Sequence, residues 1–138
     1  MNFTEMKNTI IDWVNQEHGL NVELVEESPL KSEYGECYPA DIEEGLFLIR
    51  LNQERCRENP KFMFNVLCHE LGHCISMSLN GYPDSLTSAI DEESRADLYG
   101  RGLWSTEFDS ETYFATSEDE ERNAIRLKLY TEYFGGES

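Results

Sequence analysis

The chain contains the stretch Val66-Leu67-Cys68-His69-Glu70-Leu71-Gly72-His73-Cys74, in which His-Glu-x-x-His lies within an apolar run. On an α-helix, residues four apart share one face, so His69 and His73 can bind the same cation. Zinc in a hydrolytic site takes three protein ligands and leaves one position for water, whose pKa it lowers to about 7. Glu70 lies beside the first histidine, where it can accept the proton of that water during attack on a carbonyl. The spacing therefore supplies two ligands and a base, and the third ligand must come from another segment.

The residues around this motif predict a helix from Asn59-Pro60 to about Leu79, because Asn can cap a helix and Pro is tolerated at its first position. Apolar residues on all sides of it are typical of a buried helix: Phe62, Met63, Phe64, Val66, Leu67, Leu71, Ile75 and Met77. Polar groups inside such a helix are costly without partners, and metal ligation would provide them. A buried, hydrogen-bonded pair of histidines is the alternative. Cys68 and Cys74 lie off the histidine face and are expected to fill the core.

The composition fits a single acidic domain. At 138 residues the chain can bury one hydrophobic core, and 28 Asp and Glu against 11 Lys and Arg give a formal net charge of -17. Such a surface repels phosphate backbones, so we expect no direct nucleic-acid binding. A basic protein or peptide is the favoured partner, and a role in solubility alone is the alternative explanation for the charge.

The N-terminal residues do not predict export or membrane insertion. Glu5, Lys7 and Asp12 interrupt the apolar positions there, so neither a signal peptide nor a transmembrane span is expected. No Cys-x-x-Cys pair occurs, and free thiols are the expected state of the cysteines: Cys37, Cys56, Cys68 and Cys74. We therefore expect a cytoplasmic protein that does not contact membranes.

Upstream of the motif, the pattern predicts a helix followed by three strands. Residues 4–18 carry apolar side chains at helical spacing, Gly19 is expected to cap this helix, and His18 is assigned to the helix end rather than to a metal site. Alternation over residues 20–24 predicts a half-buried strand, and residues 34–38 and 46–51 predict a β-hairpin. Residues 52–58 form either a polar connection or a short helix.

A second helix is expected within residues 88–104, where the chain carries Asp91-Glu92-Glu93-Ser94-Arg95-Ala96-Asp97-Leu98-Tyr99. Asp91 and Glu92 suit the first turn of a helix. Glu93 and Asp97 share a face, so one can ligate zinc while the other accepts the free N–H of a ligating imidazole. On the residues alone, Glu93 is equally open to a role as a surface charge.

A last helix is predicted near the C-terminus. Ser117-Glu118-Asp119-Glu120 is a capping box, and apolar positions continue as far as Phe134, before Gly135-Gly136. The expected organisation is one domain over residues 1–138, with a core at about 20–104 and a C-terminal helical segment at about 117–134.

The chain resembles the ImmA/IrrE-type zinc metallopeptidases, a gluzincin-like branch of the zincins, over residues 46–100. That family shows an apolar strand ending near Leu-Asn, an aromatic residue before a His-Glu-(Leu/Ile)-Gly-His helix, and a following helix with Glu and, three residues later, Ala. The matching segments are Leu51-Asn52, then Phe64-Asn65-Val66-Leu67-Cys68-His69-Glu70-Leu71-Gly72-His73, then Glu93-Ser94-Arg95-Ala96-Asp97-Leu98-Tyr99. Tyr99 stands where Phe is usual, and Gly100-Arg101-Gly102 departs from the small-residue continuation of the family.

The resemblance implies that His69 and His73 ligate zinc, that Glu70 is the general base and that Glu93 is the third ligand. Asp97 matches the polar residue after the family's Ala. The implied fold is α+β and minimal zincin-like, with a small twisted sheet packed against a buried HExxH helix and a second ligand-bearing helix. Mn, Fe or Ni could compete with zinc for these ligands.

The expected function is zinc-dependent hydrolysis of a peptide bond in a specific intracellular protein, and the family suggests a regulatory DNA-binding protein. An extended substrate is expected at a strand edge near residues 46–51, and Tyr82, Tyr99 or Arg95 could stabilise the oxyanion. One alternative is a non-enzymatic acidic interaction protein, with zinc for folding or with a surface that mimics nucleic acid for a basic partner. Another is a zinc hydrolase of a different bond, such as a small amide.

Overall fold

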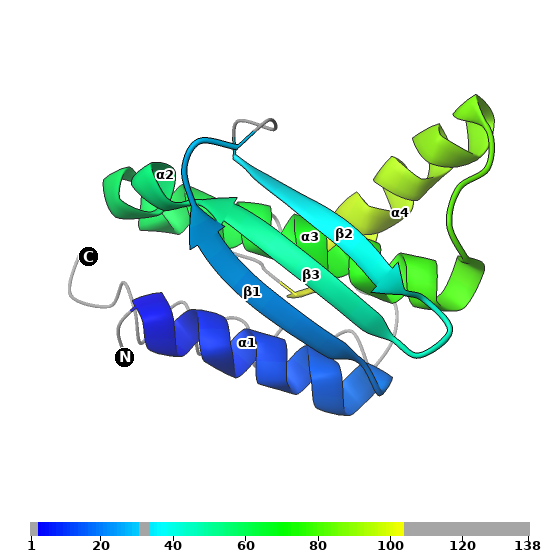
Figure 1. The fold of residues 1–138 in the computed structure, drawn as a ribbon, viewed down its shortest axis with the longest axis horizontal. Helices are drawn as coiled ribbons and strands as arrows, with labels where there is room; N and C mark the ends of the chain where they lie inside the picture. The colour runs from blue at the N-terminus through cyan, green and yellow to red at the C-terminus, as the bar shows by residue number, and fades with distance from the viewer. Residues whose placement is uncertain (1–2, 31–33, 104–138) are drawn as a thin grey trace.

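The computed structural model describes residues 3–30 and 34–103, which form an α+β arrangement of a three-stranded sheet and four helices (Figure 1). The elements follow in the order α1 (Phe3–His18), β1 (Asn21–Glu27), β2 (Gly35–Asp41), β3 (Leu46–Asn52), α2 (Gln53–Glu58), α3 (Pro60–Asn80) and α4 (Leu86–Leu103). The helix, strand and hairpin predicted upstream of the motif are confirmed, and residues 53–58 form the short helix. The helix predicted at about 117–134 lies outside the described residues.

The sheet has the strand order β1-β3-β2, so β3 lies in its centre. β1 pairs with β3 in parallel and β2 pairs with β3 antiparallel, through a turn in which Gly45 takes a φ of +72°. The expectation of a substrate-binding edge near residues 46–51 is therefore wrong, because both edges of β3 are already hydrogen-bonded. Among the described residues, the free edge of the hairpin belongs to β2, whose Pro39 suits an edge strand because it cannot donate to a sheet ladder.

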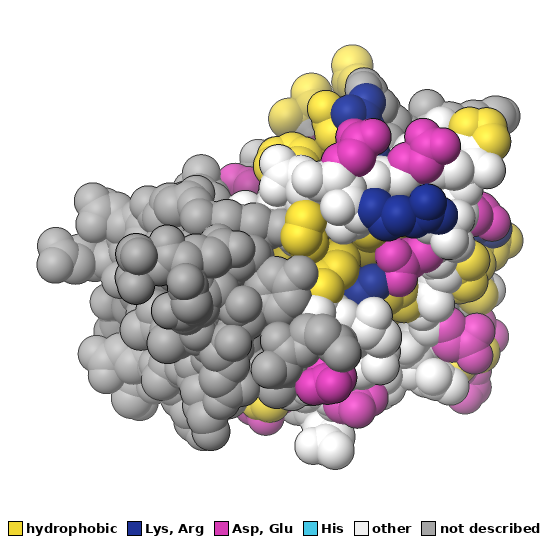
Figure 2. All heavy atoms as spheres, turned by 90° about the vertical axis from the view of Figure 1, so that its left-hand side faces the viewer, with side chains coloured by type: hydrophobic (Ala, Val, Ile, Leu, Met, Phe, Trp, Pro, Cys, Tyr) yellow, Lys and Arg dark blue, Asp and Glu magenta, His cyan; other side chains and the backbone are white. Residues whose placement is uncertain are grey.

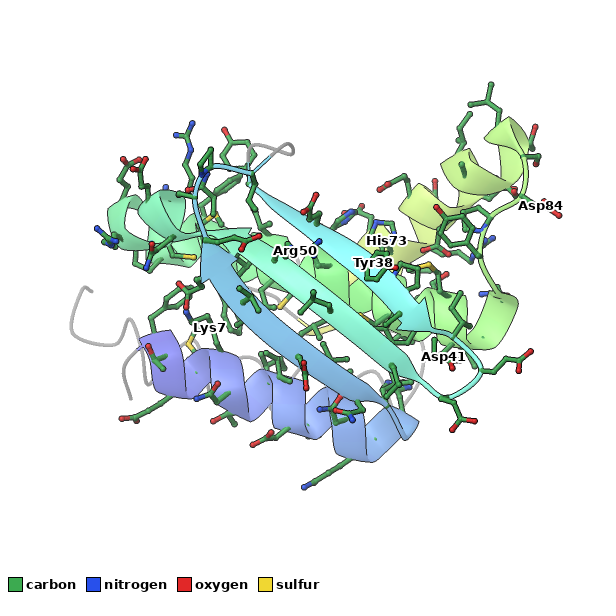
Figure 3. All side chains as sticks on the ribbon, viewed as in Figure 1. Lys7, Tyr38, Asp41, Arg50, His73 and Asp84 are labelled. Atoms are coloured by element: carbon green, nitrogen blue, oxygen red, sulfur yellow. The ribbon has the colours of Figure 1, made fainter. Side chains whose placement is uncertain are left out.

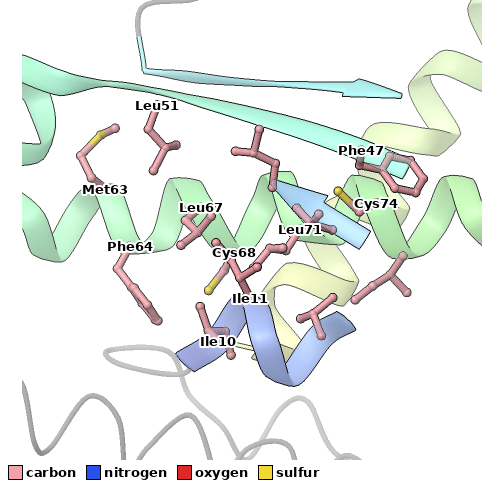
Figure 4. Packing of buried hydrophobic residues seen from close by; sticks show 14 of the residues in the cluster. Ile10, Ile11, Phe47, Leu51, Met63, Phe64, Leu67, Cys68, Leu71 and Cys74 are labelled. Carbon is pink, nitrogen blue, oxygen red and sulfur yellow. The ribbon is translucent and has the colours of Figure 1, made fainter. Parts of the chain in front are cut away.

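The hydrophobic core lies between one face of the sheet and the helices α1 and α3 (Figure 4). Alternate residues of β3 point into it, as the period of a strand requires. Its fully buried members include Met6, Ile10 and Val14 of α1, Ile49 and Leu51 of β3, and Met63, Phe64, Leu67, Leu71 and Ile75 of α3. Cys68 and Cys74 are buried in the same cluster, which confirms their predicted role.

Helix α3 begins and ends where its sequence predicts. The side-chain oxygen of Asn59 accepts a hydrogen bond from the backbone N–H of Phe62 at 3.2 Å, Pro60 occupies the first turn, and Gly81 ends the helix with a φ of +81°. The expectation that this helix is buried on every side is wrong. Phe62 and Leu79, near its two ends, are exposed, and His69 is half-buried because it faces a cleft.

Helices α3 and α4 pack closely through two glycines. A Cβ at Gly72 would collide with the backbone carbonyl of Ala96, and a Cβ at Gly100 would lie 2.7 Å from the carbonyl oxygen of Cys68. The absence of side chains at both positions lets the two backbones touch. This contact sets where the acidic residues of α4 lie relative to the histidines of α3. No helix in the described part of the chain combines the length and apolarity needed to cross a membrane.

Candidate metal centre

The predicted site residues meet in a cleft between β2, α3 and the N-terminal half of α4. The cleft has a volume of about 980 Å³, and His69, Glu70 and His73 of α3 line it together with Glu93 of α4. Tyr38, on β2, lines it as well and is labelled with His73 in Figure 3. The HExxH helix therefore presents its histidine face to a space that is large enough for a peptide segment.

His69, His73 and Glu93 converge on one point. The Nε2 atom of His69 lies 3.1 Å from Oε2 of Glu93, and the Nε2 atom of His73 lies 3.3 Å from the same oxygen. One ligand atom from each of the three residues lies within 4.8 Å of the others. The structure thus brings together the three residues that the sequence nominated from two separate helices.

This donor set fits a divalent cation. Two imidazole nitrogens and one carboxylate oxygen are ligands that zinc accepts, and three protein ligands leave a coordination position for water or substrate. The side chains of His69, His73 and Glu93 are 33%, 12% and 65% exposed, so the point at which they meet is open to the cleft. A cation held there could be reached from solution.

Glu92 holds His73 from the opposite side of its ring. Its Oε2 atom lies 2.7 Å from Nδ1 of His73, and its Oε1 atom accepts a hydrogen bond from the Ser76 hydroxyl at 2.6 Å. Arg95 completes the group, because its Nε donates to Ser76 Oγ at 3.2 Å and its guanidinium lies 3.7 Å from Glu92 Oε1. The Glu92 side chain is only 4% exposed, so these partners replace the water it loses on burial.

The contact between Glu92 and His73 was not predicted from the sequence. Asp91 and Glu92 were expected in a first helical turn, which is wrong, because α4 begins earlier, at Leu86. Of Glu93 and Asp97, one was expected to ligate zinc and the other to accept the free N–H of an imidazole; the carboxylate that lies 2.7 Å from Nδ1 of His73 is that of Glu92. A usable signal was present, since Glu92, Ala96 and Gly100 are spaced four apart and all three are buried.

Glu70 lies in the cleft beside the ligands and is buried. Burial raises the pKa of its carboxyl from 4.5 to about 7, His73 opposes this rise, and Glu93 and Glu36 add to it. A carboxyl with a pKa near neutrality is suited both to accept and to return a proton at physiological pH. Glu70, the predicted base, therefore lies beside the converging residues with a pKa near neutrality.

The cleft is acidic. Its lining includes six acidic residues and, among the described residues, neither Lys nor Arg. These are Glu36, Asp41, Glu43, Glu70, Glu92 and Glu93. Elsewhere on the surface, as on the face shown in Figure 2, Lys and Arg side chains lie among acidic ones. The charged side chains of the cleft are therefore negative, which favours a cationic ligand.

The remaining predicted residues lie in different places. Of the three suggested oxyanion donors, Tyr82 lines the cleft, whereas Arg95 is bonded to Ser76 and Tyr99 packs against the hydrophobic core. His18 lies at the end of α1 with its ring 6.5 Å from that of Trp13, as the helix-end assignment predicted. Of the three, only Tyr82 therefore remains a candidate hydrogen-bond donor to an oxyanion in the cleft.

Comparison with known proteins adds no relative. No family model, curated protein or solved structure matches this chain significantly. The site consists of two histidines and one carboxylate that could hold a metal ion, a buried carboxyl beside them, and an acidic cleft that all four residues line.

Proposed function

We propose that the protein is a zincin-like metallopeptidase that hydrolyses a peptide bond in a protein substrate. The observation that carries the proposal is the convergence of His69, His73 and Glu93 next to Glu70 in an open cleft. A metal that served only to hold the fold would need a fourth protein ligand and no base. Three ligands with a neighbouring buried carboxyl are what hydrolysis requires.

In this proposal, three residues would bind the metal and a fourth would transfer the proton. His69, His73 and Glu93 would hold the metal, which when bound polarises a carbonyl and acidifies a coordinated water. Glu70 accepts a proton from the attacking water and passes it to the nitrogen of the leaving amine. Its burial supports this role, since its pKa of about 7 places both protonation states within reach at neutral pH.

The substrate is proposed to lie along β2. All of residues 34–39 line the cleft. Neighbouring side chains of a strand point to opposite faces of the sheet, so one face alone would contribute only every second residue. The cleft therefore lies along the edge of β2. An extended peptide can add to a free strand edge through main-chain hydrogen bonds. The acidic lining favours a peptide with Lys or Arg near the scissile bond, such as a basic segment of a DNA-binding regulatory protein.

Incubation of the zinc-loaded protein with a library of basic peptides, followed by mass spectrometry of the new termini, tests the proposal. We expect cleavage by the wild type, and a loss of about 100-fold or more in Glu70→Gln with metal content unchanged. Glu54→Gln, an exposed glutamate on α2, is the matched control and should cleave at the wild-type rate. Equal cleavage by wild type and Glu70→Gln would refute the role of Glu70. Absence of cleavage by the zinc-loaded wild type would favour the alternative of an acidic binding protein.

A further inference from the structure

Two adjacent glutamates of α4 lie in opposite environments. The side chain of Glu93 is 65% exposed and faces the Nε2 atoms of both histidines, whereas that of Glu92 is 4% exposed and faces Nδ1 of His73. Consecutive residues on a helix differ by about 100° in direction, so the two carboxylates cannot point to the same place. Each therefore approaches His73 from a different side of its ring.

We propose that Glu92 is the positioning residue of the metal centre: it fixes the tautomer and ring orientation of His73 so that Nε2 is presented to the metal. The proposal rests on the metal site of the proposed function. A neutral imidazole carries its proton on one nitrogen and a lone pair on the other, and the hydrogen bond made by the first decides which is which. Since a carboxylate only accepts, the 2.7 Å contact with Glu92 favours the tautomer in which Nδ1 carries the proton and Nε2 the lone pair. The contact of Nε2 with Glu93, at 3.3 Å, is the longer of the two.

Glu92 is itself held by a chain of donors. Arg95 Nε donates to Ser76 Oγ, and the Ser76 hydroxyl donates to Glu92 Oε1. Because Ser76 lies one turn after His73 on α3, and Arg95 one turn after Glu92 on α4, the four residues tie the helices together at the height of the metal site. The Ser76 hydroxyl bonds one carboxylate oxygen of Glu92 and His73 Nδ1 contacts the other, so the carboxylate is held in place beside the imidazole.

Glu92 is not a fourth ligand. Its Oε2 atom is hydrogen-bonded to Nδ1, on the side of the His73 ring away from Nε2, and the group of converging ligand atoms contains Glu93 instead. A purely structural tie between α3 and α4 is the competing role. The two differ in one respect: only a positioning residue changes the tautomer of His73 and the metal affinity of a protein that remains folded.

The first test uses the metal-free wild type. Nitrogen-15 NMR of the histidine ring should show neutral His73 as the Nδ1–H tautomer, and Glu92→Ala should abolish this preference. An Nε2–H tautomer in the wild type would overturn the proposal. This measurement needs no substrate and no bound metal, so it stays decisive even if the wild type proves to have no peptidase activity.

The second test measures zinc affinity by competition with a chromogenic chelator. We expect Glu92→Ala to bind zinc about 10- to 100-fold more weakly, and Ser76→Ala to show a smaller loss. Glu92→Gln should rescue part of the affinity, because its amide oxygen can still accept from Nδ1. Asp91→Asn changes an exposed neighbouring acid and should have no effect. Wild-type affinity in folded Glu92→Ala would contradict the proposal. Should Glu92→Ala fail to fold, the tautomer of the wild type still decides it.

Discussion

Gly72 of α3 lies directly against the backbone carbonyl of Ala96 in α4, so closely that even a methyl group would not fit between them. Gly72 is the residue before His73, and Ala96 lies three residues after Glu93. The contact therefore sets the distance between the histidine pair and Glu93, the proposed third ligand. The glycine of the His-Glu-Leu-Gly-His motif thus has a packing reason that is separate from metal chemistry.

Gly72→Ala is expected to force α4 away from α3. Overpacking of this kind costs about 1–3 kcal/mol of unfolding free energy, and displacement of Glu93 should lower zinc affinity about tenfold or more. Chemical denaturation of the metal-free protein and chelator competition measure the two effects. Gly19→Ala is the matched control: it strains a φ of +64° where a Cβ has open space, so it should lower stability by about 1 kcal/mol and leave zinc affinity unchanged. Unaltered zinc affinity in Gly72→Ala would refute this role of the glycine.

Glu70→Gln is expected to stabilise the metal-free protein at high pH and not at low pH. Because the folded pKa of Glu70, about 7, lies above its usual value of 4.5, folding favours the protonated form. The contribution of the Glu70 carboxyl to the free energy of unfolding is therefore complete below pH 4.5. It is lost as the pH rises to 7, where the buried carboxyl must ionise. The neutral amide avoids this cost, so the variant should exceed the wild type by about 1–3 kcal/mol at pH 8 and match it at pH 4.5. Parallel stability curves across this range, measured by thermal denaturation, would contradict the prediction.

Cys37 and Cys74 are expected to form a disulfide under mild oxidation. Their Sγ atoms lie 3.6 Å apart, with Cys37 half-buried on β2 and Cys74 buried in α3. A hydroperoxide can oxidise the pair, with two thiols and one peroxide giving a disulfide, water and an alcohol. Peptide mapping should find this bond alone. Burial also raises the pKa of the Cys74 thiol, so we expect the half-buried Cys37 to be oxidised first and Cys74 to close the bond with it. Cys56, whose pKa is raised to about 12, mainly by burial, should keep its thiol. A disulfide that includes Cys56, or none after oxidation, would show that the strand and helix are arranged differently.

Glu43→Lys is expected to weaken binding of a basic peptide. The substitution places a cation in a lining that otherwise carries only negative charge among the described residues. Exposed charges of this kind contribute about 0.5–1 kcal/mol each, so KM should rise about two- to fivefold while kcat changes little. Glu17→Lys makes the same change of net charge on the exposed side of α1 and serves as the control. An equal effect of both substitutions would mean that overall charge, not the cleft, attracts the substrate.

Local patterns predicted most of the fold. The cap at Asn59, the periodicity of α3 and the alternation in β3 are properties of neighbouring residues, and each element formed where its pattern indicated. The parallel pairing of β1 with β3 joins segments far apart in the chain, and it moved the free edge from β3 to β2. No local pattern could place that edge.

The site residues, too, were predictable only where they belong to one local segment. His69, Glu70 and His73 share one helix, so their relation follows from spacing. Which acid of α4 meets them depends on how α4 crosses α3, and three acids in succession gave no means to distinguish ligand from partner. The crossing at Gly72 places Glu93 beside the Nε2 atoms of both histidines and turns Glu92 inward, against Nδ1 of His73.

The central claim, that these residues form a three-ligand metal site, is tested most directly by the metal content of the untagged protein. Mass spectrometry should find about one zinc per chain in the wild type after zinc addition and dialysis, none in His73→Ala, and a weakly held fraction in Glu93→Ala. A wild type that retains no metal under these conditions, or a Glu93→Ala variant that retains it fully, would contradict the account.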